Sequence, residues 1–304
     1  MATGDTRAAI VGVGMVPFAR RKTETLADIG WPAVRDAIAD AGIDPKRLDA
    51  CYCGTSLGGM MAGQRILGRL GMTGIPITNV ENACSSSSSA LAQAVLAVRA
   101  GKYDAVLVIG VEKLTKFGGG TLPLEKEDWE VSHGMVMPAL YAMRAKRYMH
   151  DFGLTREHLA KISVKNRRNG MLNPDAQYRK EVTVEEVLES RIIADPFTLL
   201  QCCPTGDGAA AIVVTSEKLA CTLRSDPVYV AASELTSGRF TAGFRDMTTP
   251  EITTRGAALA YEEAGLGADD INVAEVHDAT AVGELIQIEN LGLFPFGEGA
   301  AASE

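Results

Sequence analysis

Cys84 is the residue in this chain best suited to covalent chemistry. Five serines, Ser85 to Ser89, follow it between an apolar stretch (residues 75–80) and a helical pattern (residues 90–100). A thiol in the first turn of a helix faces unpaired N–H groups and the positive end of the helix dipole, which favour thiolate over thiol. Small hydroxyl residues can cap that helix and leave room for a substrate. The pattern predicts a nucleophile; the alternative is a buried cysteine before a serine-rich turn.

The composition is that of a globular protein with a sizeable core, because 46% of its 304 residues are hydrophobic. The net charge of −8 argues against nucleic acid as a partner. No run approaches 18 apolar residues, so we expect no membrane-spanning segment. Six cysteines without a CxxC pair, and only four histidines, lack the spacing of a zinc site, and we expect no metal. Free thiols favour a reducing cytoplasm.

The other cysteines are expected to be structural. Cys51 and Cys53 lie on one face of a predicted strand over residues 49–54, and Cys202 and Cys203 precede the Thr-Gly-Asp-Gly turn at residues 205–208. Cysteine is among the residue types most often buried. We therefore interpret both pairs as buried core residues.

Strand and helix patterns alternate along the chain, which indicates an α/β fold. The first part reads as a strand over residues 8–13, a helix from the cap Thr25 to Gly42, a strand over 49–54, a short helix over 63–70 and, after the Cys84 helix, a strand over 106–109. The C-terminal part repeats this order, with strands over 228–232 and 272–277 and helices over 252–264 and 282–291. Two similar halves are suggested.

The repeat stops before the second half is complete. After Gly292 only twelve residues remain, rich in glycine and alanine, so no counterpart of the Cys84 strand–helix–strand unit follows. The second sheet is expected to lack its middle, with apolar faces that have no partner.

A different segment, about residues 116–200, separates the halves. Pro138 suits the first turn of a helix that ends at Gly153, Thr155 caps another, and the capping box Thr183–Glu186 begins a third. Residues 144–191 carry a net charge of +4, while the rest of the chain carries −12. This basic segment could receive an anionic ligand such as a nucleotide phosphate, or it could be a solvated helix face.

Four segments in this order resemble the thiolase superfamily, and within it the sterol-carrier-protein type. They are NVENACS (residues 79–85), YDAVLVIGVEK (103–113), PTGDGAAA (204–211) and EVHDA (275–279). The resemblance extends over essentially the whole chain. It implies two βαβαβαββ halves in an α-β-α-β-α sandwich with a helical loop domain that helps to bind coenzyme A.

The resemblance also implies a domain division and an assembly. The N-terminal half would cover residues 1–115, completed by a strand at about 203–216; the loop domain would cover 116–200, and a partial C-terminal half 223–304. Family members are usually dimers or tetramers, paired through the N-terminal half.

Carried onto this sequence, the family pattern assigns two catalytic residues. Cys84 matches the nucleophile that becomes acylated. His277 matches the histidine that donates a hydrogen bond to the thioester oxyanion, although a histidine after an apolar strand can also be structural. Asp278 should point the other way along the strand. The usual aromatic position of this motif is Thr280, which would reshape the acyl pocket.

The chain departs from the family at its end. The Gly-His-Pro histidine that activates the nucleophile and the Cys-x-Gly cysteine that moves protons have no counterpart here. Such groups typically contribute about 10²- to 10⁴-fold each. As it stands, the chain is expected to be slow or inactive unless these groups belong to a longer natural protein or another polypeptide supplies them.

The residues and the family resemblance leave three alternative functions. The first is acyl transfer between a β-ketoacyl-CoA and CoA through a Cys84 acyl-enzyme, with coenzyme A as co-substrate and no permanently bound cofactor. The second is an aldolase acting on side-chain CoA thioesters with a small OB-fold, zinc-ribbon partner; such relatives need no cysteine nucleophile, so Cys84 argues against it. The third is a catalytically incomplete acyl-CoA-binding subunit.

Overall fold

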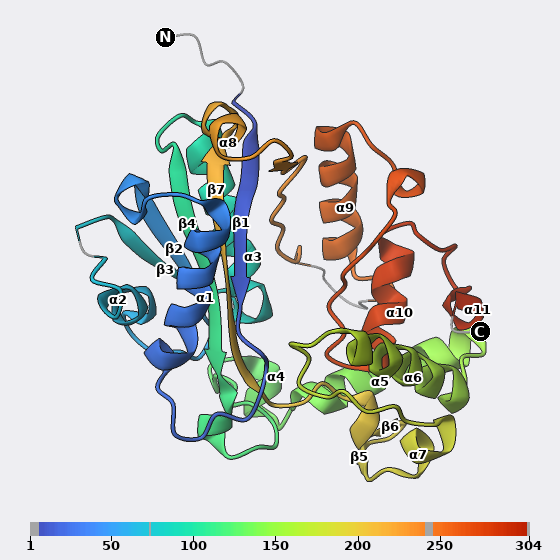
Figure 1. Cartoon of the computed structure of the whole chain (residues 1–304). Coiled ribbons are helices and arrows are strands. Elements are labelled where there is room, and N and C mark those ends of the chain that lie inside the picture. Colours follow the sequence, from blue (N-terminus) through green and yellow to red (C-terminus); the bar gives the residue numbers. More distant parts are fainter. Residues whose placement is uncertain (1–5, 73, 241–245, 303–304) are drawn as a thin grey trace. The chain divides into compact units, whose positions relative to one another are not determined.

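The computed structural model describes residues 6–72, 74–240 and 246–302. It divides into two compact units. Unit 1 comprises residues 1–118 and 205–235, and unit 2 comprises residues 119–204 and 236–304. Each unit is described by itself (Figure 1).

Unit 1 is built on a six-stranded mixed sheet in the order β3-β2-β4-β7-β1-β8. The neighbours β3, β2 and β4 run parallel, and β7 is antiparallel to both β4 and β1. The strands are β1 (Ala8–Met15), β2 (Ala50–Gly54), β3 (Ile77–Val80), β4 (Ala105–Lys113), β7 (Asp207–Ser216) and β8 (Val228–Tyr229). The predicted strand over 106–109 is confirmed as β4, which extends further at both ends. β7 lies between β4 and β1 in the sheet, although the helical segment separates it from β4 in the sequence.

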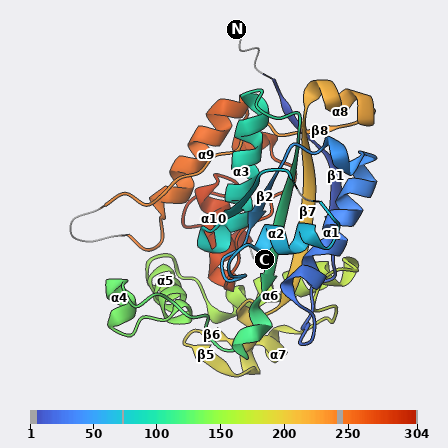
Figure 2. The same ribbon diagram turned by 90° about the vertical axis from the view of Figure 1, so that its left-hand side faces the viewer.

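Helices cover both faces of this sheet. On one face α1 (Leu26–Ala41) and α2 (Ala62–Gly68) pack on residues such as Val11, Leu107 and Val213. On the other face α3 (Ser86–Arg99) packs through its alanines and valines on Ala8, Val106 and Val214. Figure 2 shows α1 and α3 on opposite sides of the strands. A short helix, α8 (Glu217–Leu223), follows β7.

The boundaries of α1 follow directly from its sequence. The Thr25 hydroxyl accepts from the amide of Asp28, whose carboxylate accepts in return from the Thr25 amide. Gly42 ends the helix in the left-handed conformation (φ 61°), which glycine adopts without steric cost. This capping box and glycine stop confirm the predicted limits.

Unit 2 contains the helical segment predicted between the halves, followed by the C-terminal helices. Its core packs α5, α6 and α10 around Tyr148, Phe197 and Leu285. Its elements are α4 (Trp129–Ser132), α5 (Met137–Phe152), α6 (Arg156–Leu172), α7 (Val184–Glu189), the two-stranded sheet of β5 (Ile192–Ala194) and β6 (Phe197–Thr198), α9 (Glu251–Ala264), α10 (Ala281–Asn290) and α11 (Gly299–Ala302).

The predicted strands of the second half are corrected. Residues 272–277 have no strand pairing, and of the strand predicted over 228–232 only β8 forms. β8 pairs with β1 and so extends the first sheet instead of opening a second one. A strand is stabilised by its hydrogen-bonded neighbours, and within the described residues the second half supplies none. The α/β fold class is confirmed.

No helix in the described ranges is long and apolar enough to span a membrane.

Candidate active site

Cys84 lies where β3 passes into α3. The residues after β3 form a 3-10 turn over Ala83–Ser85, and α3 begins at Ser86. Cys84 is a free, exposed thiol in this turn. It precedes the first helical residue by two positions, so it lies just before α3 and not in the first turn of the helix, where the sequence predicted it.

The turn around Cys84 is held by its serine and asparagine neighbours. The Asn82 amide donates to the Ser86 hydroxyl (2.9 Å), which donates in turn to the Ala83 carbonyl (2.7 Å). The Asn82 side chain donates to the Ser89 hydroxyl (2.8 Å). Ser86 and Ser89 are both buried. The serine run is therefore a bonded scaffold for the turn and not a flexible linker.

The residue before the thiol has an unusual backbone conformation. Ala83 has φ 46°, in the left-handed region that residues with a Cβ rarely adopt. Such strain costs about 1–3 kcal/mol and persists only where the surroundings impose it. Here the hydrogen bonds of Asn82 and Ser86 on either side impose it.

Two glycines bring the first turn of α3 close to the sheet. Gly54 and Gly110 are paired residues on β2 and β4. A Cβ on Gly54 would lie 2.5 Å from the Ser86 carbonyl oxygen, and a Cβ on Gly110 would lie 2.4 Å from the Ser87 hydroxyl oxygen. The close approach of helix to strands therefore requires glycine at both positions.

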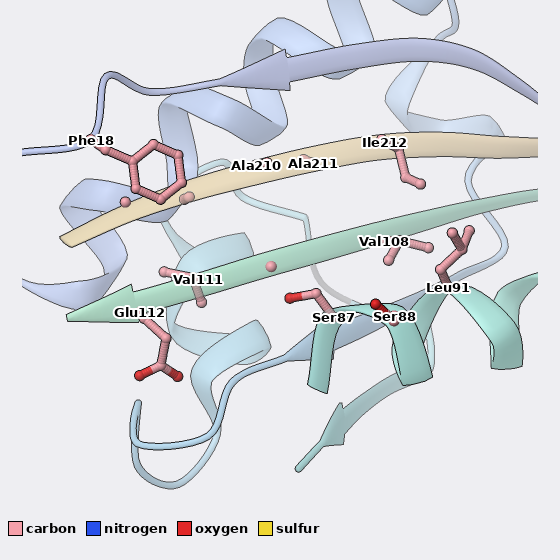
Figure 3. Close-up of a pocket in the computed structure, with 13 residues that line it drawn as sticks. Phe18, Ser87, Ser88, Leu91, Val108, Val111, Glu112, Ala210, Ala211 and Ile212 are labelled. Atoms are coloured by element: carbon pink, nitrogen blue, oxygen red, sulfur yellow. The ribbon is translucent and has the colours of Figure 1, made fainter. Parts of the chain in front are cut away.

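A cavity of about 370 Å³ lies beside this turn on the α3 face of the sheet. Figure 3 shows Ser87, Ser88 and Leu91 of α3 facing β4 and β7 across it, with Phe18 at one end. Its walls are mostly apolar, formed by residues such as Val108 and Ile212. Cys84 is not among the lining residues.

Two carboxylates, of half-buried Glu112 and buried Asp207, fix the loops at this end of unit 1. The Glu112 Oε1 accepts from the Thr55 hydroxyl and from the amides of Ser56 and Leu57 (2.5–3.0 Å). Asp207 accepts from the amides of Arg21 and Thr115 and from the Thr115 hydroxyl. Burial would raise the pKa of Asp207, but these hydrogen bonds outweigh it and lower the pKa. Neither carboxylate was predicted from the sequence, although the Thr-Gly-Asp-Gly motif was an available signal for Asp207.

His277 belongs to unit 2, where it is exposed in the segment before α10. The following residues are tied to 202–203: the Cys203 amide donates to the Ala279 carbonyl (2.9 Å), and Cys202 and Thr280 form a β-bridge. At Gly283, a Cβ would lie 3.1 Å from the His277 carbonyl oxygen. The chain that follows His277 is thus tied to residues 202–203, and Gly283 lies against the His277 carbonyl. Cys84 and His277 lie in different units, and their joint action stays a prediction.

Asp278, next to the histidine, is part of a carboxylate pair. The Asn166 side-chain amide donates to Glu284 (2.6 Å) and reaches Asp278 Oδ2 at 3.4 Å. Lys165 forms an ion pair with Glu284 (2.7 Å). Asp278 is exposed at the surface, but the protein atoms around its carboxylate partly desolvate it; this desolvation, and then the nearby Glu284 charge, raise the pKa of Asp278.

The remaining cysteines differ from one another. Cys51 and Cys53 are buried as predicted, and burial raises the pKa of both thiols, that of Cys53 to about 12. Cys202 is half-buried, and burial raises its pKa to about 11. Cys203 is exposed, which corrects the prediction of a buried residue, because it lies beyond the packed turn at the edge of a cavity. In the described ranges no three His, Cys, Asp or Glu side chains form a group that could hold a metal.

Comparison with known proteins identifies the family. The model of the thiolase N-terminal domain matches residues 8–218, and that of the thiolase C-terminal domain-like family matches residues 233–304. Benzoylsuccinyl-CoA thiolase subunit BbsB of Thauera aromatica is 42% identical over 95% of this chain and 76% of its own length. Sterol carrier protein 2 of Oryctolagus cuniculus is 36% identical over 97% of this chain and 58% of its own.

A solved structure gives the same result. The Ltp2-ChsH2(DUF35) aldolase aligns with a TM-score of 0.82 and 26% identity, over 98% of this chain and 80% of the matched one. Both family models, the curated relatives and this fold agree with the four sequence segments. The chain therefore belongs to the thiolase family, in its sterol-carrier-protein type.

Proposed function

We propose that the protein transfers an acyl group between a β-ketoacyl-CoA and CoA through a thioester on Cys84. The single observation that carries this proposal is the exposed, free Cys84 thiol on a strained, hydrogen-bonded turn at the start of α3. The thiolate attacks the 3-keto carbon, the Cα–Cβ bond breaks, and the departing acyl-CoA takes a proton at its α-carbon. Fresh CoA then gives up its thiol proton, which balances the one taken up at the α-carbon; its sulfur bonds to the acyl carbon, and the bond to Cys84 breaks to release the thiolate.

His277 is assigned to the oxyanion. As the thiolate adds to the carbonyl, negative charge develops on its oxygen, and a donor aimed at that position stabilises it. The backbone fixed at Ala279 and Gly283 supports this role because it limits how far His277 can move. Coenzyme A serves as co-substrate, and the basic residues of 144–191 are the proposed surface for its phosphates.

The proposal is tested by turnover of acetoacetyl-CoA with CoA, comparing Cys84→Ser with Cys221→Ser, a change at another exposed free cysteine. Loss of cleavage in the first variant alone supports the assignment. Equal rates in Cys84→Ser and the unchanged protein would contradict it. The assay is run with and without candidate partner polypeptides, because one relative is named a thiolase subunit and one solved structure is of a two-component aldolase.

A second function is favoured by one observation, the TM-score of 0.82 to a complex named an aldolase with a DUF35 component. In this alternative the chain acts as an aldolase, which breaks a carbon–carbon bond of a side-chain CoA thioester, together with an OB-fold, zinc-ribbon partner, and Cys84 is not needed. Carbon–carbon cleavage that survives in Cys84→Ala and requires the partner would support it. A dependence on a partner is also consistent with the name of one relative, the thiolase subunit BbsB. If the protein binds CoA esters but shows no turnover with or without partner polypeptides, it acts as a non-catalytic acyl-CoA-binding subunit.

A further inference from the structure

One row of side chains leads from Cys84 into the cavity of about 370 Å³ in unit 1. Ser87, Ser88 and Leu91 of α3 line this cavity (Figure 3). Cys84 precedes them by three, four and seven residues, which is the spacing of one helix face. The 3-10 turn that contains Cys84 keeps this alignment, because side chains three residues apart lie above one another in such a turn. The cavity therefore begins about one helical turn from the thiol.

The cavity exists because small residues of two strands form its floor. Gly110 on β4 pairs with Ala210 on β7, and Glu112 pairs with Gly208. Phe18 closes one end, where a Cβ on Gly208 would lie 2.5 Å from its ring. All the lining residues belong to unit 1, as Cys84 does. The relation between thiol and cavity is therefore set within one compact unit.

The wall of the cavity is mainly apolar. Leu91 on α3, Val108 on β4 and Ile212 on β7 form the end opposite Phe18 (Figure 3). Cavities of about 300–1,000 Å³ hold small organic molecules, so this one has room for an acyl chain of a few carbons. Each methylene group that moves from water into an apolar site raises affinity about fourfold.

Glu112 gives the cavity a negative charge. Its Oε1 accepts from the Thr55 hydroxyl and from the amides of Ser56 and Leu57, and within the described part of the chain its carboxylate has no ion pair with a lysine or arginine. The described residues that line the cavity include no Lys, Arg or His. Like charges repel strongly where little water screens them. The lining therefore suits an uncharged chain and disfavours a carboxylate.

We propose that this cavity receives the acyl chain that Cys84 carries as a thioester, and that Glu112 excludes chains with a further negative charge. The inference rests on the proposed acyl transfer and names its substrate class: β-ketoacyl-CoA esters with a short, uncharged, apolar acyl chain. Glu112 is then a specificity residue and takes no part in bond breaking.

The first test compares acetoacetyl-CoA, 3-oxohexanoyl-CoA and 3-oxoadipyl-CoA, which place an acetyl, a butanoyl and a succinyl group on Cys84. The unchanged protein should have its highest kcat/KM on 3-oxohexanoyl-CoA. Ala210→Phe fills the cavity from an exposed position and should reduce the advantage over acetoacetyl-CoA about tenfold, as expected for two methylene groups left in water. Ala100→Phe, at the exposed C-cap of α3, should keep that advantage. Equal losses on both esters in Ala210→Phe would overturn the cavity assignment.

A second variant addresses the charge. Glu112→Gln keeps an oxygen for the amides of Ser56 and Leu57 and removes the negative charge. It should therefore raise kcat/KM on 3-oxoadipyl-CoA, relative to 3-oxohexanoyl-CoA, about tenfold. Thr55→Val is the control, because it breaks one hydrogen bond of the same carboxylate but retains the charge, and it should leave the ratio unchanged. The same ratio in Glu112→Gln and the unchanged protein would restrict Glu112 to holding the loop and overturn its role in selection.

Labelling of the thiol separates failure of this inference from failure of the proposed function. Methyl and propyl methanethiosulfonate react with a cysteine thiolate, which bonds to the sulfenyl sulfur of the reagent while methanesulfinate leaves. Peptide mass spectrometry gives the ratio of the propyl rate to the methyl rate at Cys84 and at Cys221, an exposed cysteine that does not line the cavity. A higher ratio at Cys84 that Ala210→Phe abolishes supports the cavity assignment without turnover. Equal ratios at the two cysteines contradict it, whatever the turnover.

Discussion

Gly54 on β2 lies directly against Ser86, the first residue of α3, so closely that a Cβ would come within 2.5 Å of the Ser86 carbonyl oxygen. This contact sets how deeply the helix start approaches the sheet. Cys84 lies two residues earlier, so the contact also sets where its thiol stands relative to the strand ends.

Gly54→Ala should displace the start of α3 and lower both stability and turnover, because the obstructing atoms are backbone and cannot rotate away. We expect a loss of about 1–3 kcal/mol in the free energy of unfolding. The matched control is Gly68→Ala, where nothing lies within 4 Å of the new Cβ. Urea denaturation and thiolysis rates check both; unchanged activity in Gly54→Ala would show that the contact does not position the thiol.

His277→Ala should lower kcat about 10²- to 10³-fold with a smaller effect on KM, since an oxyanion donor acts mainly in the transition state. His150→Ala, a change at an exposed histidine on α5, is the control. Steady-state kinetics on the same ester measures both. A fall in His277→Ala no larger than in the control would leave His277 with a structural role.

Asp207→Asn should destabilise the protein, and the effect should depend on pH. The folded-state pKa of Asp207 is lowered from 3.8, so its stabilisation is complete above that value and is lost as the pH falls through the lowered pKa. We expect a difference of about 1.5–3 kcal/mol in unfolding free energy at neutral pH, as for hydrogen bonds to a charged group. It should shrink below about pH 4.

Asp226→Asn is the control for that measurement, because the Asp226 side chain is 82% exposed. Its unfolding free energy should change by no more than about 0.5 kcal/mol. Urea titrations at pH 7 and pH 3 compare the two variants. If the difference in unfolding free energy between Asp207→Asn and the unchanged protein were the same at both pH values, the ionised Asp207 carboxylate would not be the source of the stabilisation.

Tyr148→Phe should destabilise unit 2 by about 1–3 kcal/mol, because it leaves a buried acceptor short of a donor. The Tyr148 hydroxyl donates to Glu289, which also accepts from the Gly299 amide (2.6 Å). Burial, and then this hydrogen bond, raise the pKa of Tyr148. Tyr178→Phe, at a 40% exposed ring, is the control. Hydrogen exchange of α5 and α10 amides reports the change; equal protection in both variants would contradict it.

Local signals predicted much of the fold. Capping boxes at Thr25 and Thr183 and the glycine stops at Gly42 and Gly153 placed helix ends correctly, because they act through hydrogen bonds within a few residues. The exposed thiol before α3 followed from the same kind of pattern. These features depend on neighbours along the chain, so they can be read from sequence.

Features that depend on distant partners were missed. The strand predicted over 272–277 has suitable residues but no paired neighbour, and β8 joins the first sheet instead of a second one. Cys203 looked like a buried residue because its sequence gives no sign of the cavity beside it. Gln201 is buried and its Nε2 has no acceptor among the described residues, which could not be predicted because its burial depends on how α6 and α7 pack against residues 199–201.

The most direct test of the central claim is to incubate the protein with a β-ketoacyl-CoA, quench in acid and map the acyl group by peptide mass spectrometry. We expect one acyl group, on the peptide that contains Cys84. It should be removed when CoA is added and should be missing in Cys84→Ser. An unmodified Cys84 in protein that still cleaves the ester, or an acyl group found only on Cys203 or Cys221, would contradict it.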